Sequence, residues 1–319
     1  MTATVAAVAG HWRSQISLRT HGVYAALGVV IAFNLLFTPN FATLNNVRLQ
    51  LVQVTPVVII ALGMAIVVAT AGIDLSVGAT MALAAATLAA TLDHGPTIAI
   101  MAALLAGMLA GTFNGVLVGV VGVQPIVATL GLFIAGRGLA LMIADGRLTE
   151  IFDPAIRAFG TKQLIGGLQP GVLIALGLTA IVGILVRFTV FGKRLVAIGG
   201  SPDAAQTAGL PVRRTLIVVY VLSGLFAAVA GVLATARSGA SDPSFVGLLI
   251  ELSAITAVVV GGTPLSGGEI RVLGTVAGAV LMQLIFATLI RHDLSDADAR
   301  MVQAFIIVAA VYIQRDRLR

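Results

Sequence analysis

The stretch LVQVTPVVIIALGMAIVVATA, residues 51–71, decides the fold of this chain. It contains no charged residue, and a transmembrane helix needs about 20 consecutive apolar residues. At about 1.5 Å per residue, a helix over this stretch covers the hydrocarbon core of a bilayer, which is about 30 Å thick. The stretch therefore predicts a helix that crosses a membrane.

Nine further apolar runs flank this one, separated by charges, prolines and turn-like clusters. Together they predict an all-α polytopic membrane protein with about ten transmembrane helices. Short or glycine-interrupted runs are typical of broken or re-entrant helices that protein covers. A single transmembrane domain, 23–314, is expected between a cytoplasmic N-terminal segment, 1–22, and a cytoplasmic tail, 315–319. The nine runs are 23–38, 75–92, 97–122, 125–144, 171–187, 215–236, 245–262, 271–290 and 300–314.

The composition excludes several classes of protein. Apolar residues make up 59% of the chain and charged residues 10%. Soluble domains have about 45–50% apolar and about 25% charged residues, so the composition excludes a soluble enzyme or a large domain outside the membrane. The chain has no cysteine, and its four histidines lie outside the apolar runs. No disulfide, metal or cofactor is therefore expected in this chain.

Lysine and arginine are unevenly divided between the two sides of this topology. With the N-terminus inside, eleven of the 19 fall in inside segments and seven fall outside. Cytoplasmic loops of membrane proteins carry an excess of such cations. The pattern predicts a multi-pass protein with both termini in the cytoplasm, and the net charge of +6 indicates orientation rather than nucleic-acid binding.

Glycines form a ridge along one predicted helix, in the steps Gly107–Gly111, Gly111–Gly115 and Gly115–Gly119. Small residues at this spacing let two helix backbones approach closely. The ridge is expected to pack against another helix of the same chain, and an interface between two subunits is the alternative.

The longest inside segment, 188–214, contains a short stretch with clear helix signals. Ser201 is a good N-cap, and Pro202 suits the first helical position. Asp203 complements the positive end of the helix dipole, and Gly209 can end the helix in a left-handed conformation. A helix of about two turns is marginal alone in water, so it is expected to dock against something. Neighbouring spans, the membrane surface and a cytoplasmic partner all remain possible.

Six short motifs follow one another along most of the chain, from about residue 45 onward. They are AGIDLSVG (71–78), QPIVATL (124–130), AGRG (135–138), GGSPDAA (199–205), LSG (222–224) and GGTPLSGG (261–268). In these motifs the chain resembles the ribose/xylose-type sugar permeases of ABC importers. The stretch Glu251–Gly262 looks most similar to the galactofuranose-type branch. Branched-chain amino-acid permeases share the broad fold but match these motifs less well.

The resemblance implies the membrane subunit of a binding-protein-dependent importer in the bacterial inner membrane, with a fold like that of type II ABC importer permeases. It implies a separate ABC ATPase, a periplasmic sugar-binding protein, and a second permease copy or paralogue as partners within the lipid bilayer. The chain lacks a Gly-x4-Gly-Lys-Ser/Thr phosphate loop, so ATP and magnesium are expected on the ATPase. The short inside helix then looks like an ATPase-coupling helix. Its residues are Ser201, Pro202, Asp203, Ala204, Ala205, Gln206 and Gly209.

Two charged residues, Arg137 and Glu251, lie within apolar runs. Either charge, unpaired at the bilayer centre, costs about 2.5–3.5 kcal/mol on insertion scales. The predicted topology places both at similar depths, so they are expected to pair or to line one polar cavity. Direct contact with a sugar is the alternative.

Four further residues are candidates for the gate or the substrate pathway. Asp74 is expected to cap the helix that begins near Leu75, and a role in a gate is the alternative. Asn114 and Gln124 offer amide groups for sugar hydroxyls. Phe133 offers an aromatic face for the C–H surface of a sugar.

Two other classes of function compete with an ABC permease. An ion-coupled secondary transporter usually needs buried carboxylates or histidines that change protonation, and only Glu251 suits that role. An intramembrane enzyme is disfavoured because His-Glu-x-x-His, Gly-x-Ser-x-Gly and cysteine are all absent from the sequence. An ABC permease for a non-sugar solute, such as a branched-chain amino acid, is the remaining alternative.

Overall fold

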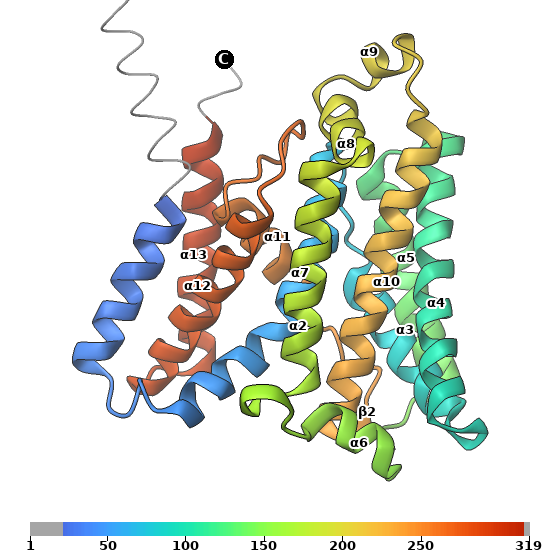
Figure 1. Ribbon diagram of the computed structural model, residues 1–319. Helices are drawn as coiled ribbons and strands as arrows, with labels where there is room; N and C mark the ends of the chain where they lie inside the picture. Colours follow the sequence, from blue (N-terminus) through green and yellow to red (C-terminus); the bar gives the residue numbers. More distant parts are fainter. Residues whose placement is uncertain (1–21, 316–319) are drawn as a thin grey trace, which may run out of the picture.

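The computed structural model describes residues 22–315 (Figure 1). Almost all of the predicted N-terminal segment and tail therefore lie outside the described residues. The elements are the helix Gly22–Phe37, α2 (Leu44–Ala69), α3 (Val77–Ala90), η1 (Leu92–His94), α4 (Pro96–Val116), η2 (Leu117–Val121), α5 (Pro125–Ile143), β1 (Thr149–Glu150), α6 (Pro154–Thr161), η3 (Ile165–Gly167), α7 (Pro170–Phe188), α8 (Val190–Gly200), α9 (Pro202–Thr207), α10 (Val212–Ser238), β2 (Ala240–Ser241), α11 (Ile250–Val260), α12 (Val272–Arg291) and α13 (Asp296–Arg315).

Within the described residues, 6 helices are long and apolar enough to cross a membrane: α2, α4 with its extension η2, α5, α7, α10 and α12. The prediction of a helical membrane protein is confirmed, whereas the number of ten spans stays a prediction. Helices α3 and α11 have 14 and 11 residues. At about 1.5 Å per residue they are shorter than a hydrocarbon core of about 30 Å.

Helix α2 lies at the centre of the bundle, where α7, α10, α11 and α12 surround it (Figure 1). Every residue of α2 from Val58 to Ala69 is buried. A helix that is apolar on all sides is typical of a protein core or of a membrane span. The apolar run at 51–71 therefore contributes the centre of the hydrophobic core.

The glycine ridge packs α4 against α10. A Cβ at Gly107 would lie 2.5 Å from the carbonyl oxygen of Gly224, and one at Gly115 would lie 2.8 Å from the Cα of Ile217. Gly111 is equally close to the backbone of Tyr220. The ridge is therefore used for packing within the chain, as the first of its two interpretations predicted.

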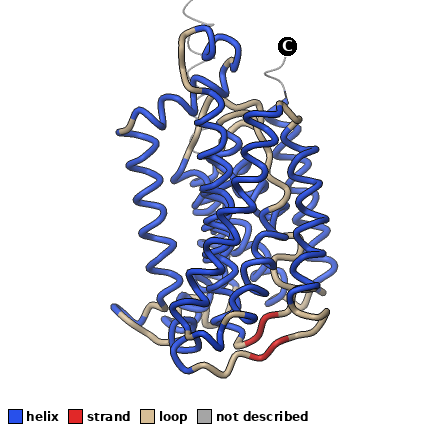
Figure 2. Tube along the Cα trace, turned by 90° about the vertical axis from the view of Figure 1, so that its right-hand side faces the viewer, coloured by secondary structure: helices blue, strands red, loops and turns tan. Residues whose placement is uncertain are grey.

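The two ends of the bundle differ in structure. Helices α8 and α9 lie beyond one end of α2 and α7 (Figure 1). The opposite end carries α6 and a short antiparallel pair in which Thr149 of β1 faces Ser241 of β2, drawn red in Figure 2. This arrangement isolates α9 at one end of the molecule.

Candidate coupling and translocation sites

Helix α9 begins with the cap that the sequence predicts. Ser201 is the N-cap residue, and its Oγ accepts a hydrogen bond from the backbone N–H of Ala204 at 3.2 Å. Pro202 occupies the first turn, where no backbone N–H is needed. Asp203 lies in the same turn, where its charge complements the helix dipole. The short helix is therefore present, and it ends at Thr207.

The chain turns back directly after α9. Gly209 has a φ of +77°, a left-handed conformation that glycine adopts readily. The N–H of Leu210 donates to the carbonyl oxygen of Ala205 at 3.0 Å and closes the helix end. Ala205 is buried, whereas Asp203 and Gln206 are exposed. Helix α9 thus rests on Ala205 and presents its charged and amide side chains to the outside.

Glycines join the base of α9 to the centre of the bundle. Gly199, near the end of α8, lies so close to the carbonyl oxygen of Ala69 that no Cβ would fit. That carbonyl, at the end of α2, accepts a hydrogen bond of 3.0 Å from the N–H of Gly268. A Cβ at the neighbouring Gly267 would lie 2.7 Å from the nitrogen of Ala71. Backbone therefore meets backbone at this junction, and no flexible side chain can absorb a displacement of α8.

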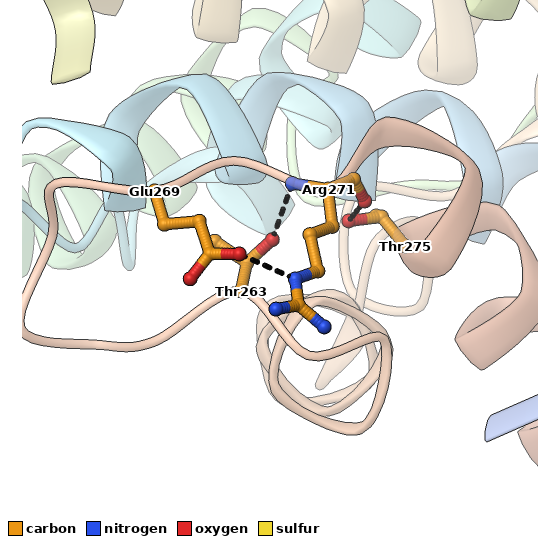
Figure 3. A network of polar contacts seen from close by, with 4 residues as sticks. All are labelled: Thr263, Glu269, Arg271 and Thr275. Carbon is orange, nitrogen blue, oxygen red and sulfur yellow. Dashed lines mark hydrogen bonds and ion pairs between the residues drawn. The ribbon is translucent and has the colours of Figure 1, made fainter. Parts of the chain in front are cut away.

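Figure 3 shows the contacts that hold the loop between α11 and α12, residues 261–271. The backbone N–H of Arg271 donates to Thr263 Oγ1 at 2.9 Å, and its Nε donates to Glu269 Oε1 at 2.6 Å. Thr275 Oγ1 donates to the carbonyl oxygen of Arg271 at 3.0 Å. The bond from Arg271 to Thr263 ties the two ends of the loop together, and Gly268 between them contacts α2 and α8.

Asp74 lies in the connection between α2 and α3 and is almost completely buried. Its Oδ1 accepts hydrogen bonds from the N–H of Ser76 at 3.0 Å and from its hydroxyl at 2.6 Å. Its Oδ2 accepts from the hydroxyl of Ser223 on α10 at 2.7 Å. Asn114 of α4 donates to Ser76 Oγ at 2.8 Å. Asp74 closes the turn before α3, where Ser76 is the N-cap residue, and it also joins α3, α4 and α10.

Arg137 of α5 and Glu251 of α11 lie near the same loop but do not form a direct ion pair among the described residues. The Nη1 of Arg137 donates to the carbonyl oxygens of Pro243 and Val246, both at 2.7 Å. Glu251 is 4% exposed, and its Oε2 lies against Gly78 without a hydrogen-bond partner in the described part of the chain. The two charges still interact electrostatically.

The remaining candidates lie in different surroundings. Gln124 is the exposed N-cap residue of α5, and its side chain makes no capping hydrogen bond. Phe133 is half-buried two turns further along the same helix. Asn114, by contrast, is fully buried in the cluster around Asp74. The structure therefore does not bring Asn114, Gln124 and Phe133 into one cavity.

Sequence reasoning missed Ser223 and Tyr220, which α10 places beside the connection between α2 and α3. Ser223 is 149 residues from its partner Asp74. A Cβ at Gly72 would lie 2.8 Å from the Tyr220 hydroxyl. The motif that spans residues 222–224 was a usable signal for Ser223, because a serine inside an apolar run needs a hydrogen-bond partner.

Comparison with known proteins gives the family of the chain. A family model described as "Branched-chain amino acid transport system / permease component" matches residues 47–311. The chain belongs to this family. The match begins within α2, spans the helices from α3 to α12 and ends within α13, so it covers both ends of the bundle.

Several relatives of the chain are named as sugar permeases. The galactofuranose transporter permease protein YtfT of Escherichia coli (strain K12) is 37% identical over 302 residues, which cover 92% of this chain and 88% of the relative. The ribose import permease protein RbsC of Haemophilus influenzae is 34% identical over 294 residues, 90% of each chain. The L-arabinose transport system permease protein AraH of Escherichia coli (strain K12) is 32% identical over 303 residues, 92% of this chain and 90% of the relative. No solved structure gave a significant match.

The resemblance to sugar permeases that the six motifs indicated is confirmed. These relatives are permease subunits of transporters rather than enzymes, in agreement with the prediction of a transport subunit. The apolar helices and the family together make the chain an integral membrane protein.

Proposed function

We propose that this chain is the membrane-spanning permease subunit of an ATP-driven importer, and that it translocates a monosaccharide delivered by a periplasmic binding protein. The observation that carries the proposal is similarity over about nine-tenths of both chains to permeases for galactofuranose, ribose and arabinose. The family description mentions branched-chain amino acids, but each of these relatives is named for a sugar.

Helix α9 is the proposed contact with the ATPase. It is short, capped at both ends, and exposed except for Ala205. Its base is fixed by close backbone contacts at Gly199 and Gly268. A rigid helix on a rigid base can transmit a push from a partner, whereas a flexible loop would absorb it. ATP and magnesium would bind the partner, because this sequence contains no phosphate-binding loop.

The proposed topology has about ten membrane segments with both termini in the cytoplasm of a bacterial cell. The short helices α3 and α11 would be broken spans, each covered by its neighbours. The end of the bundle that carries α9 would face the cytoplasm, in keeping with the cations Lys193, Arg194, Arg213 and Arg214 around it.

A second permease copy or paralogue is proposed to complete the pathway. Helix α5 supports this, because it packs mainly on α3 and leaves a broad apolar face uncovered. Ile134 is 67% exposed on that face and Met142 is 74% exposed. Lipid would cover the part of this α5 face that the second copy leaves exposed.

Reconstitution into liposomes tests the proposal. The chain would be combined with its ATPase and binding protein in the liposomes. Uptake of radiolabelled ribose, arabinose, fructose and galactose would then be measured with and without ATP. Uptake should require ATP, the ATPase and the binding protein. Uptake that ignores ATP and follows a proton or sodium gradient would instead establish an ion-coupled carrier. Leucine uptake in the same liposomes distinguishes an amino-acid permease.

A further inference from the structure

The connection between α2 and α3, residues 70–76, contacts the base of α9 at one end and the interior helices at the other. At its first end, Ala71 contacts Gly267 of the loop 261–271, and Ala69, just before the segment, contacts Gly268 of that loop and Gly199 of α8. At its second end, Asp74 binds Ser223, and the carbonyl oxygen of Ile73 accepts from Thr129 Oγ1 of α5 at 3.2 Å. One short segment thus touches the support of α9 as well as α3, α5 and α10.

The carboxylate of Asp74 is costly at this position unless it is fully hydrogen-bonded. A charge in the interior of a membrane protein is rare and is almost always paired or solvated by polar groups. Asp74 accepts three hydrogen bonds here, two of them from Ser76. A movement of the segment that breaks the bond to Ser223 therefore needs a replacement donor.

Tyr220 is placed to be that donor. It lies one turn before Ser223 on α10, is completely buried, and its hydroxyl has no hydrogen-bond partner among the described residues. The hydroxyl sits beside Gly72, two residues before Asp74 in the same segment. An unpaired buried hydroxyl costs free energy, so its retention needs an explanation. The explanation is a second arrangement of the network, in which the Tyr220 hydroxyl donates a hydrogen bond.

We infer that Asp74 is a positioning residue that exchanges Ser223 for Tyr220 as its hydrogen-bond donor when α9 is displaced by its partner. The exchange carries the displacement from the base of α9 to α10 and, through Ser76 and Asn114, to α3 and α4. This inference rests on the proposed function, because it needs an ATPase that moves α9. No covalent bond changes, and the hydroxyl proton of each donor stays on its own oxygen.

Tyr220→Phe tests the exchange without disturbing the contacts in this structure. The variant removes a hydroxyl that makes no hydrogen bond here, so the unfolding temperature of the purified chain should not fall. Sugar uptake per ATP hydrolysed in liposomes should fall about fivefold or more, the lower end of typical coupling effects. Tyr24→Phe is the matched control, because it deletes an exposed hydroxyl on the helix Gly22–Phe37.

Asp74→Asn is the second variant. Its Oδ1 can still accept from Ser76, and its amide can donate to Ser223, but that amide cannot accept from Tyr220. It should lower uptake per ATP about as much as Tyr220→Phe, and the double variant should lose no more than either single one.

The outcomes separate the two proposals. ATP-dependent uptake by the wild-type complex is the requirement of the proposed function, whatever the variants do. With that uptake present, wild-type coupling in Tyr220→Phe would overturn the exchange. A lowered unfolding temperature that accounts for its loss, or additive losses in the double variant, would overturn it as well.

Discussion

The contact between α4 and α10 predicts a large effect from one methyl group. Gly111→Ala adds a Cβ that would lie 2.9 Å from the carbonyl carbon of Tyr220 and 2.9 Å from the Cα of Val221. Both are backbone atoms, so no side-chain rotation can relieve the overlap. Carbon atoms in contact prefer a separation of about 3.5–4.0 Å, so α4 must move away from α10 by nearly 1 Å.

Two effects of opposite sign set the magnitude. Overpacking a well-packed interior costs about 1–3 kcal/mol, and a backbone-to-backbone overlap belongs at the upper end. Replacing a helical glycine with alanine recovers about 0.5–1 kcal/mol of backbone entropy. The net expectation for Gly111→Ala is a loss of about 2 kcal/mol in the free energy of unfolding.

Equilibrium unfolding in mixed micelles of a mild detergent and SDS measures this loss. Gly177→Ala is the matched control, because Gly177 is also inside a transmembrane-length helix, α7, but has no atom within 4 Å of its Cβ position. The control should be unchanged or more stable by up to about 1 kcal/mol. Equal stability of the two variants would refute the close packing of α4 against α10.

Three further predictions concern other contacts. Asp203→Arg and Gly209→Val should each reduce association with the ATPase in a pull-down while leaving membrane insertion intact. The first puts a positive charge at the positive end of the α9 dipole, and the second strains the left-handed turn after α9. Normal association and coupled uptake in both variants would count against α9 as the coupling helix. Arg137→Met should destabilise the chain by about 1–3 kcal/mol in micelle unfolding, since two loop carbonyls lose their donor. A variant in which Arg137 and Glu251 are exchanged should not restore the stability. Restored stability in that variant would show that the two residues form an ion pair. Asn34→Leu should cost about 0.6–2 kcal/mol in the same assay, because Asn34 Nδ2 donates to a threonine hydroxyl on α12 at 2.7 Å; unchanged stability would exclude a role for that bond.

The positions of most helices could be predicted from the sequence, and the errors at their ends have physical causes. The run at 51–71 became α2, but the helix begins at Leu44. The earlier residues include Asn46, whose amide donates to the carbonyl oxygen of Phe41 and whose Oδ1 accepts from Arg291, both at 2.8 Å. Such hydrogen bonds, the one from Arg291 above all, let a polar residue lie in a helix that composition alone would begin later.

The run at 245–262 shows the opposite error. Helix α11 begins only at Ile250, and Leu249 has a φ of +59°. The residues before it form a loop whose carbonyl oxygens bind Arg137. The predicted topology placed Arg137 and Glu251 at similar depths, but it did not predict the carbonyl partners of Arg137. Every residue has a carbonyl, and the sequence does not distinguish one that binds a guanidinium.

Local signals and long-range contacts differ in what one sequence reveals. The cap at Ser201 and the turn at Gly209 depend on residues within a few positions, so the spacing predicts them. The bond between Asp74 and Ser223 depends on which helices are neighbours, and apolar helices of similar composition give no periodic signal for that choice.

A membrane interior nevertheless narrows the choice. Most buried polar side chains find a hydrogen-bond partner there, since neither lipid nor apolar side chains can supply one. Ser76, Ser223 and Asn114 are buried polar residues joined to Asp74 directly or through Ser76, and the Tyr220 hydroxyl lies beside Gly72 in the same segment. Matching those few donors and acceptors, rather than searching for charge pairs, would have pointed to this cluster. In the same comparison of donors and acceptors, the Tyr220 hydroxyl has no acceptor among the described residues. An unused donor near a buried carboxylate is the feature that a network with two arrangements requires.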